Sequence, residues 1–371
     1  MVILGEDLQK PTYTILRSLN EGATDICHLA YHEVFERNVV QKTISLLGLE
    51  DSLAFGEPRL LDQFDHPNLA KVSEAQWDPQ YRGVAGLTFI MPYYEGGSLL
   101  RALQESHPFS MGDAVSLTCQ TLDALDHLHV NNGIVHRDIK PSNVFLSEDR
   151  RTAYVGDLGS AAKIDGSGYS KARGGTPLYL PPEYSTGHYS PAGDIYSTGM
   201  ILLELVNGRL PYETIDQDEV ERRNSSGKRA LSERMLTPGI HVPDALRRII
   251  RCMLNENPDR RPGSAQAAKR ELQGVRHLDW KRDLSQPYRW TGFKAHRTKT
   301  AQDRAYEVSA QRITRGINKD QFKLTARWRL QKSDNWRGMP ACETQAAEDD
   351  TATWRDFFKR VSEQAHRSAA K

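Results

Sequence analysis

The chain has 371 residues with an ordinary apolar content of 38%, and its 49 Lys and Arg against 48 Asp and Glu leave a net charge of +1. This length is sufficient for two domains or lobes, and a nearly neutral chain has no overall attraction to nucleic acid or to a membrane surface. Its apolar stretches are far shorter than the ~20 residues of a membrane span. Because residues 1–7 also lack the basic start and apolar core of a secretion signal, we expect a cytoplasmic protein without a membrane span.

Three short segments in the first 100 residues matter for the argument. Residues 39–42, Val-Val-Gln-Lys, are typical of a strand that ends in a Lys. Residues 66–69, His-Pro-Asn-Leu, lie nine residues after Glu57. The neighbouring Pro58 indicates either that a helix begins near Glu57, because Pro is tolerated in the first turn, or that a helix is kinked there. Residues 89–99 read as an apolar strand followed by a glycine-containing turn.

The most informative segment is residues 136–143, His-Arg-Asp-Ile-Lys-Pro-Ser-Asn, followed by Asp157-Leu158-Gly159. A phosphoryl transfer site needs two metal-ligating oxygens and one base within a few ångströms, and two adjacent loops can provide them. The tripeptide His-Arg-Asp alone arises often by chance. All eight residues, followed at this spacing by Asp-Leu-Gly, are a specific signal for such a site.

Three further segments follow. Residues 175–183 read Gly-Thr-Pro-Leu-Tyr-Leu-Pro-Pro-Glu, and residues 257–262 read Asn-Pro-Asp-Arg-Arg-Pro. Between them, Asp194 opens an almost wholly apolar run that ends at Val206. A helix that is apolar on all sides is buried, so this run predicts a central buried helix.

In this order, the segments resemble the motifs of eukaryotic-type (Hanks-type) serine/threonine protein kinases. The resemblance implies an α+β, bilobal protein-kinase fold, with ATP and Mg²⁺ as cofactors and Ser/Thr hydroxyl groups of proteins as acceptors. It divides the chain into a lead-in (1–12), a kinase domain (13–273, with N-lobe 13–91, hinge 92–97 and C-lobe 98–273) and a C-terminal α+β extension (274–371).

The resemblance also implies a role for each residue of the catalytic centre. Asp138 would orient or deprotonate the acceptor hydroxyl, and Asn143 and Asp157 would bind Mg²⁺. Lys140 would contact the transferred phosphate, and Thr176 would support the base. A Lys and a Thr at these two positions indicate Ser/Thr rather than Tyr acceptors.

On the nucleotide side, Lys42 would grip the α- and β-phosphates of ATP and pair with Glu57. Met91 would be the gatekeeper, and the hinge would offer the carbonyl of Pro92 and the N–H of Tyr94 to adenine. The remaining nucleotide-binding positions implied by the resemblance are Gly22, Cys27, Val40 and Phe145. Two structural contacts follow as well: Asp194 would anchor the catalytic loop, and Arg261 would pair with Glu183.

A pseudokinase scaffold is the alternative function. Residues 20–27 occupy the place of the glycine-rich phosphate loop, but they keep only the middle glycine, Gly22. Asp25 would place a negative charge near the triphosphate, where it repels ATP. This segment puts ATP affinity in doubt more than it puts the fold in doubt.

Regulation is predicted from Arg137, which precedes the catalytic Asp and in this family commonly pairs with a phosphorylated residue of the activation segment. Ser170 lies six residues before Thr176, with the basic residues Lys171 and Arg173 close by, which would favour a phosphate there. We therefore predict Ser170 as the activating site, phosphorylated in trans within a transient homodimer.

The extension differs in composition from the rest of the chain. Residues 277–371 hold 20 Lys and Arg against 12 Asp and Glu, a net charge of +8, and five of the six tryptophans. Residues 322–330 alternate between apolar and basic side chains and predict a strand, with Tyr306 and Val308 on a preceding strand. The apolar residues of 354–361 recur at helical spacing. We expect a docking or regulatory unit packed partly on the large lobe, with nucleic-acid binding as the less favoured alternative.

Overall fold

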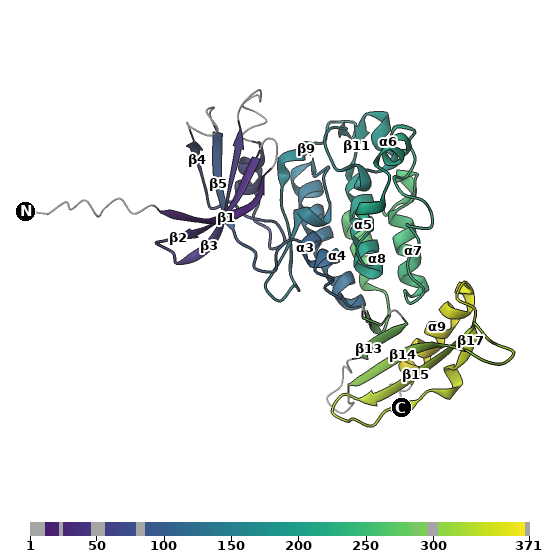
Figure 1. Ribbon diagram of the computed structural model, residues 1–371. Coiled ribbons are helices and arrows are strands. Elements are labelled where there is room, and N and C mark those ends of the chain that lie inside the picture. The colour runs from purple at the N-terminus through teal and green to yellow at the C-terminus, as the bar shows by residue number, and fades with distance from the viewer. Residues whose placement is uncertain are drawn as a thin grey trace, which may run out of the picture.

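The computed structural model describes residues 12–21, 25–45, 56–78, 86–283, 285–286, 288–294 and 303–367. A β-rich lobe lies at one end of the molecule, a helical lobe follows it, and the C-terminal extension lies beside the helical lobe on the side away from the β-rich lobe (Figure 1). This arrangement confirms the predicted α+β bilobal fold. No helix in the described ranges is long and apolar enough to cross a membrane.

The small lobe is one antiparallel sheet with strand order β1-β2-β3-β5-β4. Helix α2 begins at Gly56, so Glu57 and Pro58 lie in its first turn, which is the first of the two alternatives expected for Pro58. Their side chains lie outside the described part of the structure. The elements are β1 (Tyr13–Glu21), β2 (Asp25–His32), β3 (Arg37–Ser45), α2 (Gly56–Gln63), β4 (Glu74–Asp78) and β5 (Gly86–Pro92).

The large lobe is built around α5, in which every residue from Gly193 to Val206 is buried. This confirms the buried helix predicted from the apolar run. Helix α4 packs against both α5 and α8, and it begins with a capping box in which Ser110 and Asp113 satisfy each other's backbone N–H groups. The helices are α3 (Leu99–Gln104), α4 (Met111–Asp126), α5 (Pro191–Asn207), α6 (Gln217–Ser225), α7 (Asp244–Met253) and α8 (Ala265–Gln273).

Short strands fix the loops that carry the predicted catalytic residues. They pair as β6 with β9, β7 with β8, and β10 with β11. Their bounds are β6 (Ile134–Val135), β7 (Val144–Leu146), β8 (Ala153–Val155), β9 (Ala162–Lys163), β10 (Ser170–Lys171) and β11 (His188–Tyr189).

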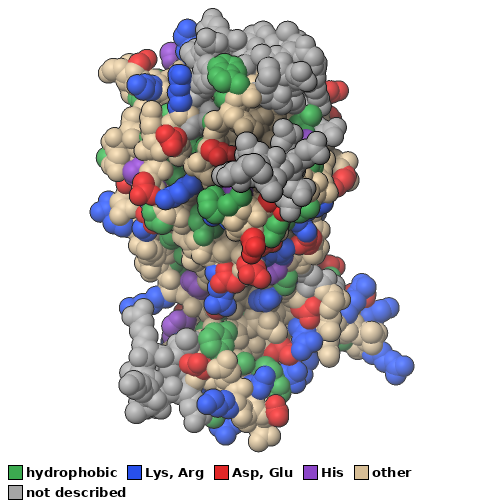
Figure 2. Space-filling view, turned by 90° about the vertical axis from the view of Figure 1, so that its left-hand side faces the viewer, with side chains coloured by type: hydrophobic (Ala, Val, Ile, Leu, Met, Phe, Trp, Pro, Cys, Tyr) green, Lys and Arg blue, Asp and Glu red, His purple; other side chains and the backbone are tan. Residues whose placement is uncertain are grey.

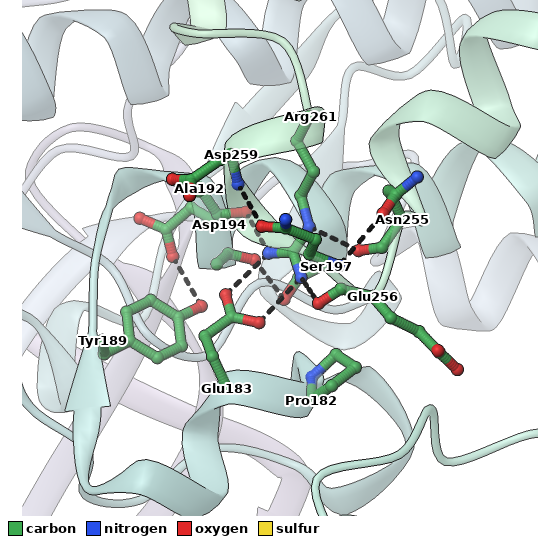
Figure 3. A network of polar contacts seen from close by, with 12 residues as sticks. Pro182, Glu183, Tyr189, Ala192, Asp194, Ser197, Asn255, Glu256, Asp259 and Arg261 are labelled. Atoms are coloured by element: carbon green, nitrogen blue, oxygen red, sulfur yellow. Dashed lines mark hydrogen bonds and ion pairs between the residues drawn. The ribbon is translucent and has the colours of Figure 1, made fainter.

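The predicted ion pair between Arg261 and Glu183 closes the base of the activation segment (Figure 3). The guanidinium binds both carboxylate oxygens, at 2.6 and 2.7 Å, and also donates to the carbonyls of Ala192 and Asn255. The Arg261 side chain is fully buried and that of Glu183 is 14% exposed. The pair is therefore structural, because removing either partner leaves a buried charge without compensation.

The extension is an antiparallel sheet with one helix packed on one face. Strands β14 and β15 pair along their whole length, and the apolar residues of β15 join those of α9 in a separate core. Both strands and the helix lie where the sequence pattern predicted them. The elements are β12 (Asp279–Arg282), β13 (Arg289–Lys294), β14 (Arg304–Arg312), β15 (Phe322–Leu330), β16 (Arg337–Gly338), β17 (Thr344–Ala346) and α9 (Thr351–Arg367).

Among the residues that the structure describes, two polar contacts join the extension to the large lobe. The Asp279 carboxylate accepts a hydrogen bond from the Gly112 amide at 2.6 Å, in the first turn of α4, where the helix dipole favours a negative charge. Arg355 of α9 binds Asp244 of α7 at 2.6 Å. In addition, Ile240 packs against the core of the extension. The extension is thus held to the large lobe by polar and apolar contacts, in line with the expected packing.

Candidate active site

The loop of residues 136–143 is held in place by Asp194, the fourth residue of α5. Its carboxylate accepts hydrogen bonds from the backbone amides of His136 (2.8 Å) and Arg137 (3.0 Å). His129 and the Tyr189 hydroxyl complete its partners, at 2.8 and 3.0 Å. Burial acts to raise the pKa of Asp194, but the hydrogen bond and charge of His129 outweigh it and keep the pKa low.

These contacts hold Arg137 in a left-handed backbone conformation, with φ of 68°. A non-glycine residue is rarely found there and is kept only where the surrounding structure enforces it. The two Asp194 bonds supply that constraint. The loop is therefore fixed in the conformation that presents Asp138.

Asp138 lies at the centre of a compact polar cluster. The Thr176 hydroxyl donates to its Oδ1 at 2.8 Å, and Lys140 Nζ lies 2.8 Å from its Oδ2. Lys140 also donates to the Thr176 hydroxyl at 2.7 Å. The Asn143 amide donates to the Asp138 carbonyl (2.9 Å) and carboxylate (3.1 Å). The structure thus brings together four residues that are separated by up to 38 positions in the sequence.

Asp157 faces this cluster from the next loop and pairs with Lys42 of β3 at 3.1 Å. Burial acts to raise the pKa of Asp157, but the charge of Lys42 and its hydrogen bond outweigh it, so the pKa lies below the usual value. The carboxylate is therefore ionised at neutral pH. The Lys42 side chain is only 9% exposed and lies over the Phe89 ring. Glu57, its predicted partner, has no described side chain.

The oxygen atoms of Asn143 and Asp157 fit a Mg²⁺ ion. Both hydrogen bonds from Asn143 to Asp138 use its NH₂ group. Its Oδ1 accepts only a long bond from the neighbouring Ser142 hydroxyl, at 3.3 Å, which a metal ion could replace. Within the described residues, Asp157 Oδ1 binds Lys42 and Oδ2 has no partner. Mg²⁺ prefers such oxygen ligands and commonly takes one or two from protein and the rest from phosphates and water.

Several residues predicted to contact ATP lie on the strands of the small lobe. Cys27 is paired in register with Lys42, and Val40 with Met91. Gly22 lies outside the described residues. Pro92 ends β5, and the carbonyl of Tyr94, two residues later, accepts a hydrogen bond from Gly97 at 2.9 Å, closing the turn after the hinge.

Phe145, on β7 of the large lobe, is held between two residues. Its ring is parallel to that of Tyr94 at a centroid distance of 5.5 Å. On another side it approaches Gly156, where a Cβ atom would lie 2.6 Å from Phe145 Cε2. Gly156 is therefore needed because the residue at position 145 is large. Sequence reasoning missed it, although it directly precedes Asp157.

The structure argues against the prediction for Ser170. This residue is 7% exposed, lies on β10, and is paired in register with Tyr189 of β11. Its hydroxyl points to the Tyr189 carbonyl at 3.5 Å. Arg137, its expected partner, donates instead to the carbonyls of Ser160 and Lys171. The expectation of an accessible loop serine facing Arg137 is wrong for this conformation.

The basic residues on one face of the extension are mostly paired. Glu307 lies between Arg289 and Arg327, at 2.6 Å from each. Lys323 and Arg329 have carboxylate partners at 3.7 and 3.6 Å. Basic and acidic side chains are accordingly interspersed over this end of the molecule (Figure 2). This arrangement does not favour nucleic-acid binding, which requires unpaired cations along a groove.

Known proteins resemble this chain over the same region. The family described as protein kinase domain matches residues 13–272. The serine/threonine-protein kinase PkaA of Streptomyces coelicolor is 33% identical over 218 residues, which cover 57% of this chain and 38% of the relative. The serine/threonine-protein kinase pkn3 of Myxococcus xanthus is 29% identical over 278 residues, covering 71% and 50%. The serine/threonine-protein kinase Nek3 of Oryza sativa is 29% identical over 264 residues, covering 69% and 43%.

The chain therefore spans half or less of the length of these curated relatives, and the match lies in the region of the kinase domain. Its motifs, its bilobal fold and the cluster around Asp138 agree with that match. The chain belongs to the protein kinase domain family, within the Hanks-type serine/threonine kinases.

Proposed function

We propose that this protein transfers the γ-phosphoryl group of ATP to Ser and Thr hydroxyl groups of proteins, with Mg²⁺ as the metal. The observation that carries the proposal is the set of contacts that Asp138 makes with Thr176 and Lys140. A pseudokinase scaffold does not require a catalytic Asp in which both carboxylate oxygens are held by hydrogen-bond or ion-pair partners. Here each oxygen has its own partner, at 2.8 Å.

Each residue of the cluster has a role in the proposed reaction. Asp138 accepts the proton of the acceptor hydroxyl, and Thr176 orients the Asp138 carboxylate. Lys140 lies where it can stabilise negative charge on the transferred group. Phosphoryl transfer needs little covalent chemistry from the protein, so positioning and charge stabilisation supply most of the rate enhancement.

On the nucleotide side, Lys42 positions the phosphates, while Asn143 and Asp157 hold the metal. When bound, Mg²⁺ would neutralise negative charge on the phosphates of ATP. Asp157 serves in its ionised form, which Lys42 stabilises. Cys27, Val40, Met91 and Phe145 enclose the adenine ring, and the hinge between Pro92 and Tyr94 provides its polar contacts.

The proposal is tested by incubating the full chain with γ-labelled ATP, Mg²⁺ and a generic basic protein. We expect label on the chain and on the added protein, and phosphoamino-acid analysis should find phosphoserine and phosphothreonine without phosphotyrosine. Absence of transferred label would favour the pseudokinase alternative. Label on tyrosine would contradict the acceptor class inferred from Lys140 and Thr176.

A second experiment tests the metal assignment separately from transfer. Asp157→Ala should abolish Mg²⁺-dependent ATP binding in a calorimetric titration, because it removes one of two protein oxygens from the metal. Asp165→Ala is a matched control, since Asp165 lies in the activation segment and binds Ser167 and Tyr169 instead. Equal Mg²⁺ dependence in both variants would remove Asp157 from the metal site.

A further inference from the structure

A cavity of about 360 Å³ lies where the extension meets the large lobe. Four segments surround it: the stretch from the end of α3 to the start of α4, the end of α5, His241 before α7, and β12. We call it the junction cavity. Its volume is within the range of small-molecule sites, which occur preferentially at interfaces between domains.

The charged side chains around the junction cavity are of one sign. Arg209, Arg282 and two histidines line it, and the described lining residues include neither Asp nor Glu. The charge of Arg209 is already compensated, because its guanidinium binds both carboxylate oxygens of Glu213. Arg282 differs, since among the described residues it has neither a carboxylate nor another hydrogen-bond partner for its side chain.

Arg282 is therefore unlike Arg289 and Arg327 of the same sheet, which share Glu307. An exposed Arg without a partner is ordinary on a protein surface. Arg282, however, lies at a cavity whose described lining has no acidic residue. It can therefore bind a negatively charged molecule there, because a guanidinium binds a carboxylate through two parallel N–H bonds.

Two residues of the lining have uncommon features. The indole Nε1 of Trp280 is buried without a hydrogen-bond partner among the described residues, although Trp280 is only 2% exposed. Buried N–H groups of Trp usually have an acceptor. Ser106, also in the lining, has φ of 55°, and such strained backbone occurs preferentially at binding sites.

The rest of the lining is apolar. Leu103, Phe109, Met111 and the ring of Trp280 provide a wall that belongs partly to the large lobe and partly to the extension. A fully polar anion would gain nothing from this wall. A ligand with an apolar body would bury that body there and direct its charged group to Arg282.

We propose that the junction cavity binds a small organic anion with an apolar body, whose acidic group pairs with Arg282. An occupant contacts the large lobe and the extension at the same time. The site is separate from the ATP cleft, because its lining contains none of the residues around Asp138, Asp157 or Lys42.

The test uses 2-naphthoate and its neutral isostere 2-naphthamide, titrated into the full chain with saturating ATP to occupy the nucleotide cleft. We expect 2-naphthoate to bind, and 2-naphthamide to bind at least about tenfold more weakly, since it lacks the charge that Arg282 recognises. The indole N–H resonance of Trp280, assigned by its loss in Trp280→Phe, should shift during the 2-naphthoate titration.

Arg282→Gln should weaken 2-naphthoate binding about tenfold and leave ATP binding and thermal stability unchanged, because Arg282 is exposed. Arg315→Gln is the matched control, an exposed Arg on the turn between β14 and β15, and should bind as the wild type does. Three results would each overturn the proposal: no binding of 2-naphthoate up to its solubility limit, equal binding of the amide, or equal binding by Arg282→Gln.

Discussion

Replacing Gly156 by Ala should weaken ATP binding, mainly through a steric contact with the ring of Phe145. The added Cβ would lie 2.6 Å from Phe145 Cε2, 3.2 Å from its Cδ2 and 3.1 Å from the Cβ of Ala70. Carbon atoms in contact normally lie about 3.5–4.0 Å apart, so the Phe145 ring must move by roughly 1 Å. Because Tyr94 stacks on that ring, we expect the movement to narrow the nucleotide cleft.

The size of this effect follows from the cost of overpacking, which is about 1–3 kcal/mol. If the whole cost falls on the ATP-bound state, the KM for ATP rises roughly 5- to 150-fold. The assay is the initial rate of label transfer at several ATP concentrations and a fixed, saturating acceptor. Thermal unfolding of the same variant separates an effect on the cleft from loss of the folded state.

A double variant tests whether the ring of Phe145 causes the loss. Phe145→Leu alone removes the ring that the methyl group added by Gly156→Ala would meet. The double variant Gly156→Ala, Phe145→Leu should therefore recover a KM close to that of Phe145→Leu alone. An unchanged KM in Gly156→Ala would show that the ring moves without cost. A double variant as impaired as Gly156→Ala would show that Phe145 is not the cause.

Three more predictions follow from named contacts. Ser170→Ala should transfer phosphate at close to the wild-type rate, because Ser170 is buried in β10 and Arg137 binds two carbonyls of the activation segment. Loss of activity in this variant, together with phosphate found on Ser170 of the wild type by mass spectrometry, would contradict this. Arg261→Ala should lower the free energy of unfolding in chemical denaturation by about 3–5 kcal/mol, because Glu183 loses its partner, whereas Arg260→Ala, at an exposed position, should have little effect. Burial lowers the pKa of His241 from its ordinary value of 6.5 to about 4, so protonation of His241 favours the unfolded chain. The free energy of unfolding should therefore fall by roughly 3 kcal/mol as the pH drops from 6.5 to about 4. His241→Gln should lack this contribution to the pH dependence, and an equal pH dependence in the variant would refute the assignment.

The residues that carry the chemistry were predictable from the sequence because their types and spacing have few other uses. Asp138, Lys140, Asn143 and Asp157 lie on two adjacent loops, so their proximity follows from short chain distances. Thr176 is different, since its contact with Asp138 spans 38 positions. It was predicted only through the family resemblance, which supplies long-range pairing that local patterns do not.

The structure places Ser170 differently from the expectation, and the reason is physical. The prediction used the distance of Ser170 from Thr176 along the chain, which does not reveal that β10 pairs with β11. Strands of two residues are too short to show a periodic pattern in the sequence. Gly156 was missed for a related reason. Its importance depends on the ring of Phe145, earlier in the chain, and sequence patterns do not show that the two are in contact.

In the extension, regular alternation predicted β14 and β15, and helical spacing predicted α9. Strands β12 and β13 were not predicted, since each is short and its inward positions combine Trp with Gly or a basic residue. Trp280 packs over Gly292, where a side chain would meet its ring at 2.6 Å. The junction cavity depends on how these strands meet the large lobe, so only the structure could reveal it.

The most direct test of the proposed activity is the rate of γ-phosphoryl transfer by the wild type and by Asp138→Asn, measured side by side with labelled ATP, Mg²⁺ and a basic acceptor protein. Asn keeps the shape of Asp138 and the bond from Thr176 but cannot accept the hydroxyl proton. We expect transfer by the wild type and a rate lower by orders of magnitude in Asp138→Asn, with ATP binding retained in both. Equal rates in the two proteins would contradict the assignment of Asp138 as the base.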